Sequence, residues 1–488
     1  MSRSVSMSRG AVISVTMRWT DRLVGLLSTI ILARLLVPDD FGIIAMASVV
    51  VGLIDVILNL GVHVALIQNN EAEQSHYDTA WTLGVIQAFI STILLYLSAP
   101  FVADYYHDPR VILVLQVMAA SVLIGGFTNI GVVDFQKNME FGMDFRFFFY
   151  KRLLSFIVTI GAASLLHSYW ALVIGSMTGK IIGVGLSYSM HSMRPKFSLA
   201  RFNDIFSISQ WILVKNIGSY LDNKMDKLFI GNRATATTLG AYTLADEIAS
   251  LPSTELLAPL SRVLFPAFVK VKHDLQALKR AYLLALGVQT LVGIPAGVGL
   301  ALVAKELVIV LLGQKWTAAI PFLQVIGFIN IIWAIGASGS YVLLALGKVK
   351  IIALYVWIQA VLFITLVMVV MPHGDAMTIA LSRLAVAFFG LISFAILLKL
   401  EITCLKFRDM IMEIWRPVVA VIIMFICVIS LNLPINWPVG FILTTKIIIG
   451  ALSYTASLLV VWLLSGSQDG AERYLLDKIL HFVQHNLK

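Results

Sequence analysis

The most regular feature of the chain is a succession of long apolar stretches separated by short polar segments. Because a helix rises 1.5 Å per residue, about 20 apolar residues cross the roughly 30 Å hydrocarbon core of a bilayer. The stretches are continuous and do not alternate residue by residue, which predicts membrane-spanning helices rather than barrel strands. The pattern predicts fourteen spans, near residues 11–34, 41–66, 79–102, 111–133, 148–166, 169–190, 205–231, 237–266, 279–304, 319–346, 350–371, 376–399, 415–433 and 439–464.

Two internal similarities indicate that the spans form repeated halves. Residues 31–34 with Gly42 and Ala47 resemble residues 229–232 with Gly240 and Ala245, which lie 198 positions later. Residues 115–117 resemble residues 323–325 at a similar spacing. Repeated halves around a central site are a recurring plan of transporters. We therefore expect an all-α membrane protein with two pseudo-repeated six-helix lobes around a central cavity, followed by two further helices.

The predicted divisions follow from this repeat. They are a first lobe over 1–190, a second lobe over 205–399, two appended spans over 415–464, and an amphipathic cytoplasmic tail over 468–488. Such a tail is expected to lie on the membrane surface.

The distribution of Lys and Arg predicts the orientation. These residues gather in the loops on the side of both termini, and we count Lys151 and Arg152, at the start of the span near 148–166, with them. Positive loops stay in the cytoplasm, so both termini are predicted to be cytoplasmic. The opposite loops hold only Arg34, Arg110, Arg233, Lys305 and Lys315.

Composition narrows the function. Of the 488 residues, 59% are hydrophobic and 13% are charged, whereas a soluble domain carries about a quarter charged residues. No loop is long enough to hold an ATPase. Cys404 and Cys427 form no CxxC pair, and the nine histidines form no ligand motif. We therefore expect a transporter rather than an enzyme, with no metal or other cofactor.

Ionisable residues within the spans are the candidates for a functional site. A charge at the bilayer centre costs about 2.5–3.5 kcal/mol on insertion scales, so such residues must line water or pair with one another. They follow polar stripes of helical spacing in spans one, seven and eight. The candidates for substrate binding in the cavity are the basic residues Arg18, Arg22, Lys215, Lys224 and Lys227. The candidates for ion coupling or charge balance are Asp21, Asp222, Asp226, Asp246, Glu247 and Glu255.

Two interpretations of these charges stay open. In the first, the basic residues bind an anionic substrate in a hydrated cavity, and the acids carry protons or balance charge. In the second, neighbours within one helix only neutralise one another, as Asp21 could do with Arg18 and Arg22, and Asp222 and Asp226 with Lys224 or Lys227. We favour the cavity for the set as a whole. Lys180, Arg383 and Lys446 stand alone in their spans, and Lys180 and Lys446 are long enough to snorkel to the interface.

Several short motifs resemble those of the Wzx-type polysaccharide flippases. They are Leu32–Gly42 (LARLLVPDDFG), Ala65–Gln68 with Asp78–Trp81, Asp226–Gly231, Arg262–Phe268, and Gly313–Trp316 with Ile320–Gln324. Their order and spacing are most similar to the colanic-acid exporter branch of the multidrug/oligosaccharidyl-lipid/polysaccharide exporter superfamily. The resemblance covers about residues 10–400.

The resemblance implies a V-shaped pair of six-helix lobes that alternates access across the bacterial inner membrane. It implies transport of an undecaprenyl-diphosphate-linked oligosaccharide from the cytoplasmic to the periplasmic leaflet, for surface or exopolysaccharide biosynthesis. The implied partners are this lipid-linked substrate, membrane lipids, and a polysaccharide polymerase with its co-polymerase. It assigns no catalytic residues. The net charge of +9 fits the bias of cytoplasmic loops, so no nucleic-acid partner is expected.

Two alternatives remain from the sequence. A cation-coupled multidrug antiporter of the same superfamily would suit a more acidic pocket than this one. A membrane glycosyltransferase or polymerase would need a large outer loop or a cluster of carboxylates in a loop. Because no nucleotide site is visible, we expect transport to be driven by an H+ or Na+ gradient or by consumption of the product.

Overall fold

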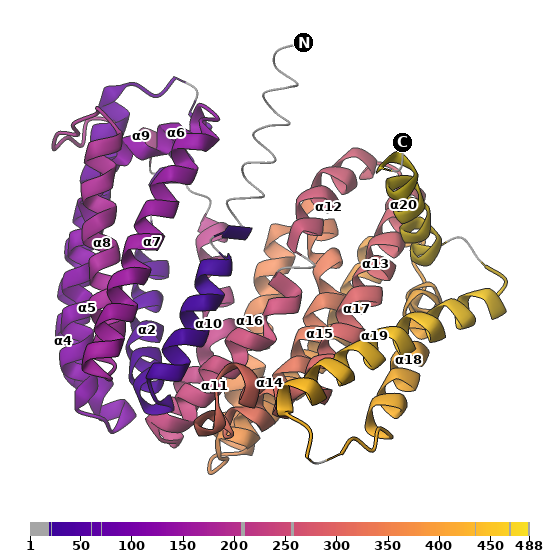
Figure 1. Cartoon of the computed structure of the whole chain (residues 1–488). Coiled ribbons are helices and arrows are strands. Elements are labelled where there is room, and N and C mark those ends of the chain that lie inside the picture. The colour runs from indigo at the N-terminus through magenta and orange to yellow at the C-terminus, as the bar shows by residue number, and fades with distance from the viewer. Residues whose placement is uncertain are drawn as a thin grey trace. The chain divides into compact units, whose positions relative to one another are not determined.

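The computed structural model describes residues 19–20, 22–59, 61–69, 71–205, 210–254, 258–434, 436–467 and 470–486. These residues are almost entirely helical and include no β-strand, which confirms the predicted all-α class (Figure 1). The chain divides into two compact units, residues 1–240 and residues 241–488.

The first unit is a bundle of antiparallel helices. Its closest pairs are α4 with α5 and α7 with α8, and α2 packs against both α5 and α10. A helix over 22–35 is followed by α2 (Pro38–Leu58), α3 (Val62–Gln68), α4 (Gln74–Tyr106), α5 (Arg110–Gly126), α6 (Val133–Lys137), α7 (Phe141–Leu166), α8 (Trp170–Met190), α9 (Phe202–Ile205) and α10 (Gln210–Arg233).

The second unit is built in the same way. Helix α13 packs against α15 and α18, and α18 forms a hairpin with α19. Helix α11 (Ala236–Ala249) starts in the first unit and continues into the second. The other helices are α12 (Ala258–Val271), α13 (Leu275–Leu302), α14 (Ala304–Leu311), α15 (Ala319–Ala345), α16 (Val349–Thr365), α17 (Ala376–Glu401), α18 (Phe407–Ile429), α19 (Val439–Leu464) and α20 (Ala471–Asn486).

The described residues include ten helices that are long and apolar enough to cross a membrane, so the chain is a multi-pass membrane protein. Helix α5 and the segment Ile130–Lys137 pass the same test only when taken together, and they are bent from each other by 71°. The predicted number of fourteen is not confirmed. The predicted span 205–231 corresponds to α10, which is rich in charge, and the spans 11–34 and 237–266 include residues outside the described ranges.

Two glycines allow backbones to approach closely in the first unit. A Cβ atom built on Gly42 of α2 would lie 1.8 Å from the carbonyl oxygen of Ala236. A Cβ atom built on Gly240 of α11 would lie 1.8 Å from the carbonyl oxygen of Pro38. Both Pro38 with Ala236 and Gly42 with Gly240 are 198 positions apart, which is the spacing of the predicted repeat, so the contact is reciprocal between positions that this prediction makes equivalent.

Candidate functional site

Three basic residues of the first unit lie far from the ends of their helices. Lys180 is at the midpoint of α8. Lys151 and Arg152 follow ten and eleven residues after the start of α7 at Phe141, which places them about 15 Å along the helix axis. The helix starts seven residues before the predicted position 148, so these two residues lie within α7 and not at its start. We call Lys151, Arg152 and Lys180 the basic group.

Each member of the basic group lies against a glycine. A Cβ atom on Gly183 would be 3.2 Å from Cε of Lys151, and one on Gly125 would be 3.1 Å from Cδ of Lys180. A Cβ atom on Gly25 would be 2.9 Å from Nη2 of Arg152. The missing side chains therefore leave room for the long stems of the basic residues.

Two members of the basic group, Lys151 and Lys180, bring positive charges near each other. The ammonium groups of Lys151 and Lys180 are near enough to repel each other. Lys151 is half-buried, whereas Arg152 and Lys180 are exposed. Like charges held together in a membrane protein are stabilised by a bound anion, so this region can bind an anionic group.

The predicted charges of span seven lie along α10. Lys215, Asp222 and Lys224 are half-buried, and Asp226 and Lys227 are buried with 6% exposure each. The backbone N–H of Lys227 donates a hydrogen bond of 2.8 Å to Oδ1 of Asp226. Whether these charges serve transport or only balance one another stays a prediction.

Contacts with α2 fix the position of α10. The hydroxyl of Tyr220 donates a hydrogen bond of 2.7 Å to the carbonyl oxygen of Val49. The same hydroxyl would lie 2.3 Å from a Cβ atom on Gly52, so any side chain at that position would force Tyr220 to move.

The other predicted site residues are spread over the chain. Arg22 is half-buried in the helix over 22–35. In α11, Asp246 is half-buried and Glu247 is exposed. Arg18, Asp21 and Glu255 lie outside the described residues. Within the described ranges, no three His, Cys, Asp or Glu side chains are grouped as ligands of a metal ion.

Two basic residues of the second unit that stand alone in the sequence have partners in the structure. Nζ of Lys446 in α19 lies 2.7 Å from Oε1 of Glu306 in α14. Arg383 in α17 is 3% exposed, and its guanidinium lies 5.4 Å from the ring centre of Trp333 and 5.6 Å from that of Phe363. Both are therefore held in place by unit 2 itself.

An extended segment at one end of the first unit, residues 193–201, crosses α4 and is called the strap. Three of its backbone N–H groups donate to side chains of α4. Lys196 N bonds Oδ1 of Asp78 at 3.0 Å, Ser198 N bonds Oγ1 of Thr82 at 2.9 Å, and Arg201 N bonds Oγ1 of Thr79 at 3.2 Å. These three acceptors lie on one face of the helix.

The acceptors of the strap are themselves fixed. Oγ1 of Thr79 donates to the carbonyl of Ser75 at 2.9 Å, and Oγ1 of Thr82 donates to that of Asp78 at 2.7 Å. Each hydroxyl therefore both donates and accepts. The ring of Trp81 lies 4.8 Å from that of Phe197, centre to centre. The Asp78–Trp81 motif thus has a structural role in the first unit.

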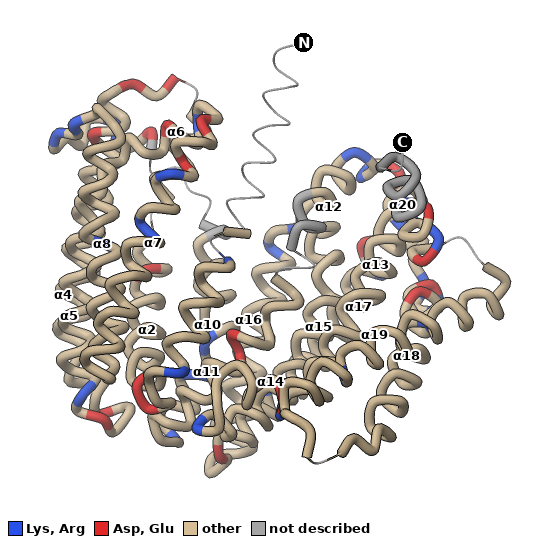
Figure 2. The backbone as a smooth tube through the Cα atoms, viewed as in Figure 1, with Lys and Arg blue, Asp and Glu red and all other residues tan. Residues whose placement is uncertain are grey.

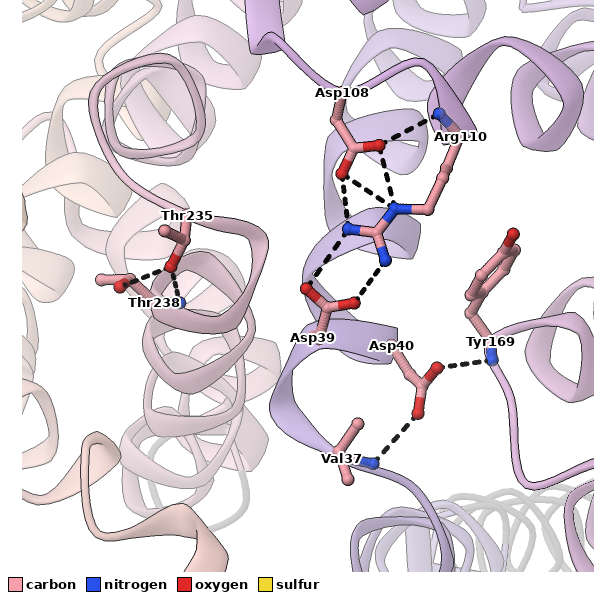
Figure 3. A network of polar contacts seen from close by, with 8 residues as sticks. All are labelled: Val37, Asp39, Asp40, Asp108, Arg110, Tyr169, Thr235 and Thr238. Atoms are coloured by element: carbon pink, nitrogen blue, oxygen red, sulfur yellow. Dashed lines mark hydrogen bonds and ion pairs between the residues drawn. The ribbon is translucent and has the colours of Figure 1, made fainter.

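The opposite end of the first unit is fastened by an ion-pair network (Figure 3). Arg110 at the start of α5 pairs with Asp39 and with Asp108, at 2.7 Å each. Oδ1 of Asp40 accepts a hydrogen bond of 2.7 Å from Tyr169 N, and its Oδ2 accepts one of 3.0 Å from Val37 N. Burial alone would raise the pKa of Asp108, but the hydrogen bonds and charge of Arg110 outweigh it and hold that pKa below its ordinary value.

Comparison with known proteins identifies a family and related sequences. The profile of the family described as "Polysaccharide biosynthesis protein" matches residues 31–321. The lipopolysaccharide biosynthesis protein WzxC of Escherichia coli K12 is 23% identical over 402 residues, which are 80% of this chain and 81% of that protein. The teichuronic acid biosynthesis protein TuaB of Bacillus subtilis 168 is 26% identical over 63% of this chain and 64% of that protein.

A similar fold occurs in a solved structure. The lipid II flippase MurJ in an inward closed conformation superimposes with a TM-score of 0.75 at 13% identity. The match covers 93% of this chain and 99% of that one. At this level of identity, the match shows only that the two chains have a similar fold.

Proposed function

Because the chain belongs to the family of polysaccharide biosynthesis proteins matched over residues 31–321, we propose that it is a lipid-linked oligosaccharide flippase. It moves an undecaprenyl-diphosphate-linked repeat unit from the cytoplasmic to the periplasmic leaflet by alternating access, for surface or exopolysaccharide biosynthesis. The fold shared with a lipid II flippase supports the transport of a polar headgroup whose lipid tail stays in the membrane.

The basic group carries this proposal. A diphosphate bears negative charges that hydrocarbon cannot solvate, and Lys151, Arg152 and Lys180 offer cations about halfway across their helices. Charge-assisted hydrogen bonds to phosphate are among the stronger polar contacts in proteins. Arg22, Lys215, Lys224 and Lys227 are further candidates for binding the diphosphate or acidic sugars. A multidrug antiporter for cations would need the opposite charge at this place.

The setting of the transporter follows from the same proposal. It resides in the bacterial inner membrane with both termini in the cytoplasm, and a polymerase and co-polymerase use its product.

A single cysteine in place of His273, in a Cys404→Ser, Cys427→Ser background, tests this orientation. An impermeant thiol reagent should label it only after the cytoplasmic side is opened, and labelling from the periplasm in intact cells would overturn the orientation.

We also propose that an H+ or Na+ gradient drives transport. Asp222, Asp226, Asp246 and Glu247 are the candidate coupling residues, because acids within membrane helices exchange protons or bind cations when neighbouring charges tune them. Flipping in proteoliposomes should be faster with an imposed gradient, and Asp→Asn variants should lose this dependence at equal protein amounts. Equal rates with and without the gradients would contradict the coupling.

The decisive experiment measures flipping of a lipid-linked oligosaccharide in proteoliposomes. One lost charge-assisted contact is worth about 1.5–3 kcal/mol, so Lys151→Gln and Lys180→Gln should each slow flipping about 10- to 100-fold. Lys270→Gln, which removes an exposed lysine at the end of α12, is the matched control. If all three variants flip at the same rate, the basic group does not bind the substrate.

A further inference from the structure

The second unit contains a cavity of about 440 Å³ in which both signs of charge meet. Its walls come from the first turns of α13, from α18 and from the start of α20. The charged and apolar side chains that line it include Arg280, Leu283, Leu284, Glu413, Arg473 and Asp477. This volume lies within the range of about 300–1,000 Å³ that is usual for small-molecule sites.

A buried ion pair holds α20 against the bundle and so builds one wall of the cavity. Nη1 of Arg416 in α18 lies 3.2 Å from Oε1 of Glu472 in α20, and their side chains are 6% and 7% exposed. Gly287 in α13 makes room for this docking, because a Cβ atom there would lie 2.7 Å from Cβ of Ala471 and 2.9 Å from Oε2 of Glu413. The cavity is therefore a built part of the fold.

Glu413 faces this cavity with its hydrogen-bonding capacity unused. Among the described residues, no N–H or O–H group donates a hydrogen bond to its carboxylate, although the side chain is half-buried. The nearby Arg416 is bonded to Glu472, whose own negative charge repels that of Glu413. A carboxylate in this position is stabilised by a ligand that donates hydrogen bonds and carries positive charge.

Arg280 on the opposite wall is a cation that lacks an anionic partner among the described residues. In the described part of the chain it lies within 4.0 Å of no carboxylate, although Glu413 and Asp477 line the same cavity. Arg473 adds a second guanidinium. Guanidinium groups bind phosphate oxygens through paired hydrogen bonds. The cavity thus offers an anion-binding side and a cation-binding side.

The position of the cavity suggests the source of such a ligand. Arg280 is five residues after the start of α13 and Glu413 is six residues after the start of α18, so both lie near one end of membrane-spanning helices. Figure 2 shows acidic and basic residues gathered beside α20 at this end. Leu283 and Leu284 continue from the charged part toward the apolar part of α13. A headgroup at the membrane boundary meets this arrangement of charges and apolar surface.

We propose that this cavity binds a phospholipid headgroup that combines a phosphodiester with a primary ammonium group. The phosphate lies at Arg280 and Arg473, the ammonium group donates to Glu413 and Asp477, and the glycerol and first methylenes contact Leu283 and Leu284. Such a lipid joins α20 to α13 and α18. A purely anionic headgroup offers Glu413 only neutral hydroxyl donors and no positive charge, and a quaternary ammonium group has no N–H with which to donate a hydrogen bond.

Native mass spectrometry of the delipidated full chain tests the proposal. Phosphatidylethanolamine, phosphatidylglycerol and phosphatidylcholine with identical acyl chains are compared with soluble glycerophosphoethanolamine. The loss of one charge-assisted contact corresponds to about a tenfold weaker binding or more, so the ethanolamine lipid should bind about tenfold more tightly than the other two lipids. Equal binding of the ethanolamine and choline lipids would overturn the proposal. Equally tight binding of the soluble ester supports the same chemistry with a soluble source.

Variants assign the binding to this cavity. Glu413→Gln should reduce the preference for ethanolamine over choline, because only Asp477 is then left to accept from the ammonium group, and Arg280→Gln should weaken binding of both lipids about tenfold. Arg280 is exposed, so its replacement keeps the test valid if Glu413→Gln does not fold. Arg408→Gln, which removes an exposed arginine of α18 outside the cavity, is the matched control. If Arg280→Gln binds both lipids as the control does, the headgroup binds elsewhere and the assignment is wrong.

Discussion

Replacing Gly42 with alanine places a methyl group on the carbonyl oxygen of Ala236. The added Cβ would be 1.8 Å from this oxygen, whereas ordinary contacts begin at 3.4 Å, so the helix ends must separate by about 1.6 Å. Alanine is otherwise favoured over glycine in a helix by about 1 kcal/mol. Overpacking costs about 1–3 kcal/mol, and the upper end applies here because the clash is with backbone. We expect Gly42→Ala to destabilise the protein by about 2 kcal/mol.

The assay is membrane abundance together with the midpoint of thermal unfolding in detergent. A loss of about 2 kcal/mol lowers abundance several-fold in cells. Gly161→Ala in α7 is the matched control, because no atom lies within 4 Å of its added Cβ. Gly240→Ala should behave like Gly42→Ala, since its Cβ meets the carbonyl of Pro38 at the same distance. If Gly42→Ala is as abundant and as heat-stable as Gly161→Ala, the backbone contact does not exist.

Three further predictions concern other contacts. Asp78→Ala removes the acceptor for Lys196 N and should speed tryptic cleavage of the strap, and an unchanged cleavage rate would show that the strap is held otherwise. Arg416→Gln leaves Glu472 buried without its cation and should cost about 3–5 kcal/mol in thermal unfolding, whereas replacing both residues with Met should restore most of it. Because the folded pKa of Asp108 is lowered, its stabilising effect is present above about pH 4 and is lost as the pH falls through the folded pKa, so the difference in unfolding midpoint between the wild type and Asp108→Asn should shrink below pH 4.

The membrane helices were predictable because hydrophobic length is a local property. Each predicted span that lies within the described residues has a helical counterpart. The boundary of α7 was not predictable in the same way. The charged residues Asp144 and Arg146 have the composition of a loop, and the adjacent aromatic run does not mark where the helix starts. The distance of Lys151 from the start of its helix therefore became visible only in the structure.

The partners of the charges could not be predicted because they come from distant parts of the chain. Lys446 pairs with Glu306, which is 140 positions away. The glycines that receive Lys151 and Lys180 lie on neighbouring helices, and glycine in an apolar run has many other uses. The sequence did mark Lys180 as a lone basic residue in an otherwise uncharged span, but a side chain long enough to snorkel to the interface gave no reason to place it in the site.

The strap illustrates a different limit. The Asp78–Trp81 motif is visible in the sequence, but the groups that it binds are backbone amides, which every residue except proline carries. The side chains of the strap therefore do not show in the sequence that its backbone N–H groups bind α4. A motif on one helix can be recognised while its partner segment stays hidden.

The reciprocal contact of Gly42 and Gly240 has a consequence for the origin of the chain. Gly42 meets Ala236, and Gly240 meets Pro38, each member 198 positions from its equivalent. In an isologous interface of a two-fold dimer, residue i meets residue j and j meets i in the same way. A half-length ancestor would have made both contacts with a second copy of itself. Under the predicted repeat, duplication and fusion of such a half would keep these two contacts without a new surface.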